Sequence, residues 1–335
     1  MKQIQDLEGK IFLTCSACMS VLADGLSWAN ANKDKITKKI EEADNIILLS
    51  CQVTDLAVLN DLKIIEDYKK KHPEKNYFIG GCLGKRPDIK LPDFVERLET
   101  PRTNYQFLED RTLVNFEKPF WVKDFKENDD WFQQGHLFRN MYPLRIGKGC
   151  PNKCTYCTIR FTRGDFEEYE ASKLEKEFLA HENVLLIADS PTVNQVKDWH
   201  AIAIKNDKPF SIRNVEPSIT VQCKNELLEL AKKSLLKVYH SPIQSNNQDV
   251  LPDMNRSVKD TLETIEIAKK LKSLGTYIAT NIIIDYKDFK QDFSEIYGLY
   301  DYVSWNPLWD RKWDRKKAEQ RFEKYLGENA EVEIK

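Results

Sequence analysis

The sequence carries almost no net charge. Its 335 residues include 51 Lys and Arg against 53 Asp and Glu, which gives a formal net charge of −2 at pH 7. A chain this close to neutrality has no overall field that would attract it to nucleic acid or to a membrane surface. Charged residues still make up 31% of the chain, above the usual quarter, and this indicates a well-hydrated surface.

Long hydrophobic runs and targeting signals are absent too. No apolar stretch approaches the length of about 20 residues that a membrane-spanning helix requires. The opening residues, MKQIQDLE, are too polar for a secretory signal peptide. The sequence therefore predicts a cytoplasmic protein with no membrane partner. In that reducing compartment its eight cysteines are better explained as ligands than as disulfides.

The sequence also offers few groups for conventional catalysis. Its five histidines form no evident Ser/His/Asp or Cys/His nucleophilic set. No glycine-rich loop of the kind that holds a phosphate is visible. No catalytic residue can be named on this basis, and the cysteines are the most informative feature.

Three of the cysteines fall within eight residues, in the segment 145–157 (RIGKGCPNKCTYC). The glycines and the proline predict a loop, because they interrupt helix and strand alike. Thiolates are the ligands of iron–sulfur clusters. With only Cys150, Cys154 and Cys157 as ligands, one iron of a four-iron cluster would stay open to an external molecule. The alternatives are half of a zinc site and a loop that contains cysteines by chance. Zinc usually closes with a second Cys or His pair, and none follows nearby.

Apolar runs and helical patterns alternate over roughly residues 8–122. Strands are predicted at 10–14, 45–50 and 76–80, and helices at 21–43 and 56–71. This β-α-β-α-β order predicts a parallel sheet in a Rossmann-like α/β domain.

Cysteines follow each of these strands. Cys15 and Cys18 come after the first, Cys51 after the second and Cys82 after the third. Ligands of open parallel sheets gather at the carboxyl ends of the strands, so these cysteines are expected to converge. Any one of them alone could be a small buried hydrophobic residue.

Strand–helix alternation resumes after Pro143. Candidate strands lie at 144–146, 184–187, 210–213, 237–240, 276–284 and 302–305, and candidate helices at 171–181, 225–233, 258–274 and 313–326. About six β/α units would place the residues that follow each strand around one mouth.

The Cys-x3-Cys-x2-Cys loop resembles the signature of the radical S-adenosylmethionine (SAM) enzymes. Further motifs narrow the resemblance to the methylthiotransferases, which modify transfer RNA or a ribosomal protein. These motifs are CQVT at 51–54, GCLGKR at 81–86, RG at 163–164, IR at 212–213, HSPIQS at 240–245, MNR at 254–256 and TNIII at 280–284.

The resemblance implies an α/β fold in which the N-terminal parallel domain is followed by a partial (β/α)6 radical SAM barrel. It divides the chain into an N-terminal methylthiotransferase-like domain with an auxiliary cluster (1–122), a linker (123–142), the barrel (143–310) and a C-terminal helical tail (311–335). The tail could contact substrate or close the barrel.

The resemblance also implies SAM and two [4Fe–4S] clusters, with an electron donor such as flavodoxin or ferredoxin. One cluster would be held by Cys150, Cys154 and Cys157, and the other by Cys18, Cys51 and Cys82. Residues expected to contact SAM are Tyr156, Arg213, Gln244 and Asn281. A hydrogen-bonded structural role for His240 is as reasonable as a catalytic one.

The first auxiliary ligand is open between two cysteines. In the family this cysteine ends a Thr-Phe-Gly-Cys segment and is followed by an Asp six residues later. Cys18 with Asp24 fits that register and is favoured. Cys15 occupies the place of the threonine and is a possible substitute.

The chain departs from the family in four places. Asn247 replaces the family's second Ser after Gln-Ser, and Asn281 replaces an acidic residue. Residues 285–289 (DYKDF) replace Gly-Phe-Pro-Gly-Glu-Thr, and the sequence ends at Lys335, where family members continue into a small β-barrel. The missing barrel, together with the near-neutral charge, favours a peptide or protein substrate over transfer RNA.

The expected function is insertion of a methylthio group at an unactivated C–H bond. The alternatives are a transfer RNA methylthiotransferase, another radical SAM enzyme with an auxiliary cluster, and a non-catalytic iron–sulfur or zinc-binding protein.

Overall fold

The computed structural model describes residues 2–52, 54–99, 111–117, 141–284, 286–287, 289–307 and 313–320. The chain divides into two compact units, Met1–Asp124 with Trp309–Lys335, and Phe125–Leu308. Residues 123–140 of the predicted linker, and 311–312 and 321–335 of the predicted tail, lie outside the described ranges.

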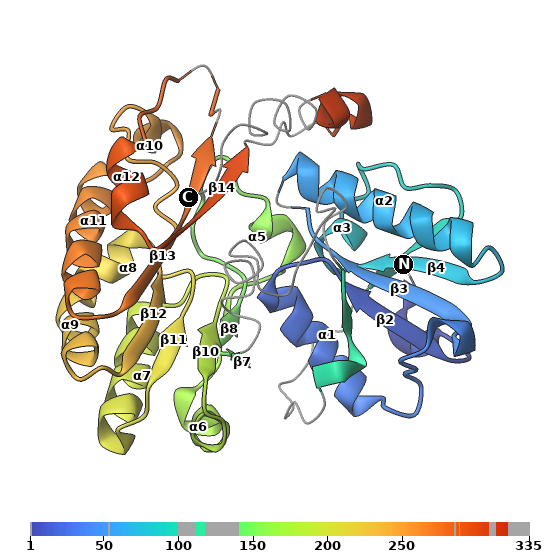
Figure 1. Ribbon diagram of the computed structural model, residues 1–335, viewed down its shortest axis with the longest axis horizontal. Helices are drawn as coiled ribbons and strands as arrows, with labels where there is room; N and C mark the ends of the chain where they lie inside the picture. Colours follow the sequence, from blue (N-terminus) through green and yellow to red (C-terminus); the bar gives the residue numbers. More distant parts are fainter. Residues whose placement is uncertain are drawn as a thin grey trace. The chain divides into compact units, whose positions relative to one another are not determined.

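The first unit is built on a parallel sheet whose six described strands run in the order β1-β5-β4-β3-β2-β6 (Figure 1). The strands are β1 (Lys2–Gln3), β2 (Ile11–Cys15), β3 (Asn45–Ser50), β4 (Asn76–Gly80), β5 (Val95–Glu99) and β6 (Asn115–Phe116). The helices are η1 (Ile4–Asp6), α1 (Met19–Ala31), η2 (Ile40–Glu42), α2 (Asp55–Lys71), α3 (Gly81–Gly84) and η3 (Arg111–Leu113). The predicted strands at 45–50 and 76–80 coincide with β3 and β4.

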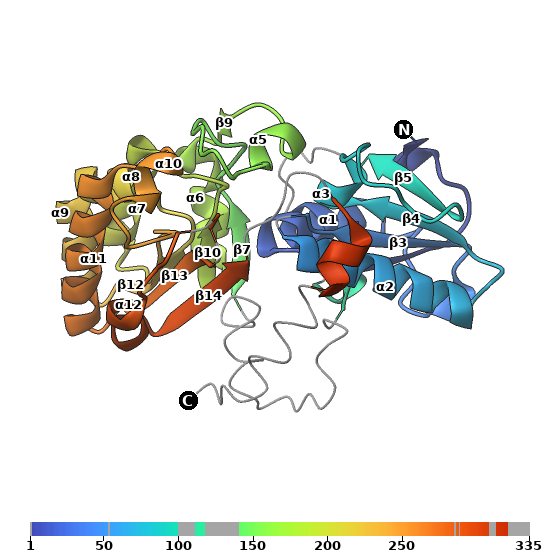
Figure 2. The ribbon, with the colours of Figure 1, turned by 90° about the horizontal axis from the view of Figure 1, so that it is seen from above.

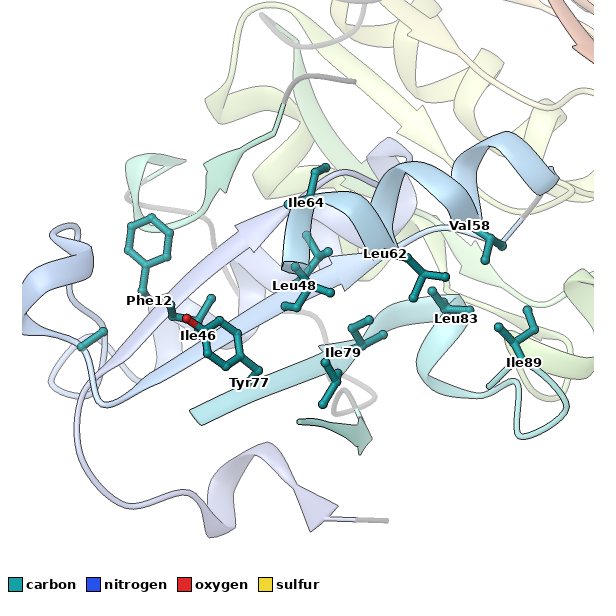
Figure 3. Close-up of a cluster of buried hydrophobic side chains, with 13 residues drawn as sticks. Phe12, Ile46, Leu48, Val58, Leu62, Ile64, Tyr77, Ile79, Leu83 and Ile89 are labelled. Atoms are coloured by element: carbon teal, nitrogen blue, oxygen red, sulfur yellow. The ribbon is translucent and has the colours of Figure 1, made fainter. Parts of the chain in front are cut away.

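Helices α1 and α2 cover opposite faces of this sheet. Leu62 of α2 packs with Ile46 and Leu48 of β3 in the core cluster drawn in Figure 3. Gly25 of α1 lies directly against Leu49, where a Cβ would stand 2.2 Å from the leucine Cδ1. Successive residues of a strand point to opposite faces, so the two helices enclose β3 between them.

Helix α1 ends at Ala31, so the predicted helix at 21–43 is wrong beyond that residue. The side-chain amide of Asn32 donates to the carbonyl of Trp28 at 2.8 Å, and such local bonds end helices. Ile36, which extended the apolar pattern, instead forms an isolated bridge with β2.

The second unit contains a parallel sheet whose six described strands are neighbours in chain order, β7-β10-β11-β12-β13-β14. They are β7 (Tyr142–Arg145), β10 (Val184–Ile187), β11 (Phe210–Ile212), β12 (Leu236–His240), β13 (Tyr277–Ile284) and β14 (Tyr302–Pro307). This consecutive order is that of a partial barrel. The predicted α/β class is confirmed.

The long helices of the second unit lie on the outer side of the sheet (Figures 1 and 2). They are α6 (Ala171–Ala180), α7 (Val193–Asn206), α9 (Lys224–Lys232) and α11 (Val258–Ser273). Shorter elements are β8 (Gly147–Lys148), α5 (Ile159–Thr162), β9 (Glu167–Glu168), α8 (Pro217–Gln222), α10 (Val250–Asp253) and α12 (Ser294–Leu299). None of the helices in the described ranges has both the length and the apolar composition of a membrane span.

Helix α7 was not predicted, although the sequence contains its start signal. Thr192 and Gln195 form a capping box in which each side chain accepts a hydrogen bond from the backbone N–H of the other. The helix buries Val196, Trp199 and Ala203 at helical spacing.

The described part of the C-terminal segment belongs to the first unit. Residues 315–320 are helical, and Trp313 packs against the core cluster of Figure 3. Arg315 contacts both carboxylate oxygens of Glu66 on α2, at 2.6 and 3.1 Å. This part of the tail therefore packs on the first unit, whereas closure of the barrel was one of the two alternatives.

Candidate cluster and SAM site

The carboxyl ends of the strands in the second unit carry the chemically distinctive residues. Arg145 ends β7, Asp189 follows β10, Arg213 follows β11, and His240 ends β12. Asn281 lies within the longer strand β13. Because the strands are parallel, these residues share one edge of the sheet, as the sequence predicted.

A short ladder closes the cysteine loop. β8 pairs antiparallel with β9, so the loop leaves and returns at the same point. Gly149, immediately before Cys150, has φ +70°, and a Cβ there would meet the backbone oxygen of Asp165 at 2.6 Å. Only glycine fits this position.

A buried carboxylate holds the first residues of the loop. Oδ2 of Asp189 accepts from the Gly149 N–H at 2.8 Å and pairs with Arg145 at 3.4 Å and Arg163 at 3.3 Å. The Asp189 side chain is only 6% exposed. Burial opposes its ionised form, but Arg163 and then Arg145 outweigh this effect, so the pKa of Asp189 lies below its ordinary value.

The three thiols of the loop are half-buried and form no disulfide. Burial, followed by the neighbouring loop thiols, raises the pKa of Cys157 to about 11, and burial also raises the pKa of Cys150. Among the described residues, no three Cys, His, Asp or Glu side chains are placed to hold a single metal ion. The ligands of a four-iron cluster bind different irons and stand farther apart, so three mutually interacting thiols on one loop fit a cluster.

The segment that contains the MNR motif lies against the same loop. The Thr155 N–H donates to the carbonyl of Met254 at 3.2 Å, and the Thr155 hydroxyl donates to the carbonyl of Asp253 at 2.8 Å. The amide of Asn255 donates to the carbonyl of Lys153 at 3.1 Å. These contacts fix the loop on both sides of its second cysteine, Cys154.

Arg256, which was not among the site residues predicted from the sequence, also contacts this loop. Its Nη1 lies 3.7 Å from the Cys154 Sγ and 3.3 Å from the Tyr156 hydroxyl oxygen. Its Nη2 donates to the carbonyl of Pro242 at 2.7 Å and lies 3.6 Å from Glu216. In the sequence, only the MNR motif at 254–256 pointed to Arg256.

Tyr156 anchors the loop to the barrel through its ring. The ring packs against a buried cluster of Val250, Met254, Ile283 and Tyr286. Burial raises the pKa of Tyr156 well above its usual range, so its hydroxyl stays neutral.

His240 is buried and neutral. Its Nδ1 accepts from the N–H of Asn214 at 3.1 Å, so Nε2 carries the proton and donates to Oδ1 of Asn281 at 3.1 Å. Burial, and then the charge of Arg213, lower the pKa of His240 to about 3. These contacts describe a residue that orients the Asn281 amide.

Gln244 is held beside the same strand. It adopts φ +68°, donates its N–H to the carbonyl of Asn281 at 2.9 Å, and accepts from the Ile283 N–H at 2.8 Å. A non-glycine residue with positive φ is uncommon and needs such support. The structure thus brings Gln244 and Asn281 together, with Arg213 close enough to His240 to affect its pKa.

The auxiliary cysteines lie at or just beyond the carboxyl ends of β2, β3 and β4 in the first unit, with Cys82 inside the short helix α3. Ser50 and Gly81 form a bridge, so Cys51 and Cys82 each stand one residue beyond paired positions. Cys18 is exposed at the N-cap of α1, whereas Cys15 is fully buried within β2. The side-chain positions thus distinguish the two candidates for the first ligand.

Two buried side chains, Asp61 and Arg86, tie these segments together. Asp61 of α2 accepts from the Cys51 N–H at 2.7 Å and from the Ser16 hydroxyl. Arg86, four residues after Cys82, donates to the side-chain oxygen of the fully buried Gln52. Burial raises the pKa of Asp61 to about 7, although its hydrogen bonds favour the ionised form.

The family model described as the radical SAM superfamily matches residues 144–299. This stretch is similar to the radical SAM enzymes. It begins within β7 and ends with α12, and it includes both the cysteine loop and the MNR segment that is hydrogen-bonded to it.

Curated relatives extend the similarity beyond this domain. The chain is 28% identical over 293 residues to ribosomal protein uS12 methylthiotransferase RimO of Clostridium botulinum (strain Loch Maree / Type A3), covering 78% of this chain and 64% of the relative. For RimO of Caldicellulosiruptor saccharolyticus the identity is 25% over 345 residues, covering 88% and 73%. For tRNA-2-methylthio-N(6)-dimethylallyladenosine synthase of Rickettsia canadensis it is 25% over 260 residues, covering 66% and 56%.

The chain is therefore methylthiotransferase-like over most of its length, and it spans about 64% of the first of these relatives. Among solved structures, coproporphyrinogen III oxidase (HemN) from Escherichia coli aligns with a TM-score of 0.36 at 14% identity, covering 56% of this chain and 52% of that one. A likeness of this size supports no further conclusion.

Proposed function

We propose that this protein is a radical SAM methylthiotransferase that inserts a methylthio group at an unactivated C–H bond. The observation that carries the proposal is the pairing of two cysteine sites in a methylthiotransferase-like chain. One site is the loop with Cys150, Cys154 and Cys157, which is hydrogen-bonded to the segment that contains the MNR motif. The other consists of the cysteines that follow three neighbouring strands of the first unit.

The radical SAM domain implies SAM and one [4Fe–4S] cluster. When bound, these groups supply one-electron cleavage of SAM and a radical that removes hydrogen from carbon. In our proposal the thiolates of Cys150, Cys154 and Cys157 hold the cluster. Gln244 and Asn281 present fixed polar groups to SAM, and Arg213 supplies positive charge beside them. The neutral ring of His240 keeps the Asn281 oxygen occupied, so the amide N–H groups of Asn281 are the ones offered to the ligand.

The second cluster would be held by Cys18, Cys51 and Cys82. Exposure favours Cys18 over Cys15, because the Cys15 side chain is enclosed within β2 and faces the carbonyl of Ala17. The resulting site would hold the sulfur that is methylated and transferred, and its open position would serve that purpose.

A peptide or protein side chain is our preferred substrate. The relatives that act on ribosomal protein uS12 share up to 28% identity with this chain, against 25% for the transfer RNA enzyme. The net charge of −2 also provides no basic field for RNA. The electron would come from a low-potential donor such as flavodoxin or ferredoxin.

The proposal is tested by anaerobic reconstitution with iron, sulfide, SAM and dithionite, followed by mass spectrometry of candidate substrates. We expect a uS12-derived peptide to gain the mass of one CH2S unit, and Cys154→Ala to abolish this gain. Gain on transfer RNA alone would overturn the substrate preference. Formation of 5′-deoxyadenosine with no methylthio product on either substrate would favour another radical SAM reaction.

A further inference from the structure

We propose that Arg256 sets the reduction potential of the cluster on the cysteine loop by donating a hydrogen bond to the Cys154 sulfur, and that Glu216 moderates this effect. The inference rests on the proposed function, because it requires a cluster on Cys150, Cys154 and Cys157. It assigns separate tuning roles to Arg256 and Glu216, which come from different segments of the barrel.

The guanidinium of Arg256 is fixed in place. Its side chain is 3% exposed, with Nη1 directed to the Cys154 Sγ at 3.7 Å and Nη2 to the carbonyl of Pro242 at 2.7 Å. The Arg256 backbone N–H donates to the carbonyl of Leu251 at 2.9 Å. Asn255, with φ +57°, is bonded to the loop through Lys153. These contacts fix the distance between the Arg256 guanidinium and the Cys154 sulfur.

Glu216 provides the opposing charge. Its Oε1 lies 3.6 Å from Nη2 of Arg256, while its Oε2 accepts from the Ser218 N–H at the start of α8. The Glu216 side chain is 16% exposed and is held by that cap. A carboxylate at this distance partly neutralises the positive charge of the guanidinium. It faces Nη2 and so leaves Nη1 free to donate to the sulfur.

The direction of the effect follows from the charge change on reduction. The cluster accepts one electron from an external reductant, so its reduced form carries one more negative charge. A buried positive charge and an N–H···S bond stabilise that form, which raises the potential. Interactions in a buried site are weakly screened. Arg256 therefore eases loading of the electron and lowers the driving force for cleavage of SAM.

The test is a redox titration of the full-length, anaerobically reconstituted protein, monitored by electron paramagnetic resonance. The signal followed is the one that changes when SAM is added, which identifies the cluster on the cysteine loop. For Arg256→Gln we expect about a tenfold lower ratio of reduced to oxidised cluster at the wild-type midpoint. This equals a shift of about 59 mV to more negative potential for a one-electron couple. Arg256→Lys keeps the positive charge but lacks the two guanidinium nitrogens that reach the Cys154 sulfur and the Pro242 carbonyl. The shift of its potential should therefore be smaller than that of Arg256→Gln and in the same direction.

Glu216→Gln should shift the potential the opposite way, because it retains an acceptor for Ser218 but removes the opposing charge. Lys224→Gln, which removes a charge on the outer face where Lys224 pairs with Glu263, should match the wild type. Opposite shifts cannot arise from general loosening of the site. An unchanged potential in Arg256→Gln at full iron loading, or shifts of the same sign in Arg256→Lys and Glu216→Gln, would overturn the inference. Absence of any SAM-sensitive signal in the wild type would instead count against the proposed function.

Discussion

The carboxylate of Asp61 accepts a hydrogen bond from the backbone N–H of Cys51 at 2.7 Å. The same carboxylate accepts from the Ser16 hydroxyl, so one buried side chain of α2 joins the loops that follow β2 and β3. The loops that carry the proposed auxiliary ligands are thus positioned by a residue that is not itself a ligand.

Asp61→Ala should weaken both the fold and the auxiliary site. It removes the carboxylate that accepts from the Cys51 N–H and the Ser16 hydroxyl, and we expect the free energy of unfolding to fall by about 1–3 kcal/mol. Iron bound per chain should fall from about eight toward about four, as one of two four-iron clusters is lost. Chemical denaturation and iron analysis measure these changes.

Two controls accompany that variant. Asp67→Ala removes an exposed carboxylate from the same helix and should change neither quantity appreciably. Asp61→Asn keeps an acceptor and should retain most of the iron. Equal iron loading in Asp61→Ala and the wild type would show that Asp61 does not position the auxiliary loop.

Asp189→Asn should destabilise the second unit. It removes the carboxylate that pairs with Arg145 and Arg163, whose side chains are 5% and 10% exposed. Breaking a buried ion pair on one side costs about 3–5 kcal/mol in unfolding free energy. Glu263→Gln breaks a partly exposed pair and should cost less than about 1 kcal/mol. Similar losses in the two variants would contradict the role given to Asp189.

His240 should make stability depend on pH in acid. Its pKa is lowered to about 3 in the folded protein, so the unfolded chain binds the proton more readily. Stability is then constant above the unfolded pKa of about 6.5 and is lost as pH falls toward the folded value. The slope contributed by one such group is at most about 1.4 kcal/mol per pH unit.

Denaturation of wild type and His240→Gln at about pH 7 and about pH 5 tests this assignment. We expect the wild type to lose more stability between the two conditions than the variant, because glutamine does not titrate. Identical losses would mean that His240 binds a proton as readily in the folded protein as in the unfolded chain, which would contradict this assignment.

The local parts of the fold could be predicted from sequence. The cysteine loop is recognisable because ligand spacing and loop-forming residues lie within one short segment. β3, β4 and β10 match their predicted ranges because each is a short apolar run bounded by polar residues. Helix α1 was predicted too long, since Ile36 continues the helical spacing but pairs with β2.

The supporting residues could not be predicted in the same way. Asp61 and Asp189 read as ordinary surface carboxylates, and only the fold shows that both are buried against cysteine-bearing loops. Arg256 contacts a sulfur 102 residues earlier in the chain. No periodicity encodes such a contact, so the motif alone marked this residue.

The measurement that tests the account most directly is the yield of two SAM products in two cysteine variants. Wild type should form 5′-deoxyadenosine and S-adenosylhomocysteine, because one SAM is cleaved and another donates a methyl group. At full iron loading of the remaining site, Cys154→Ala should form no 5′-deoxyadenosine. Cys82→Ala should still form it but should lose S-adenosylhomocysteine and the methylthio product. Equal loss of 5′-deoxyadenosine in both variants would contradict the assignment of two cysteine sites with separate roles.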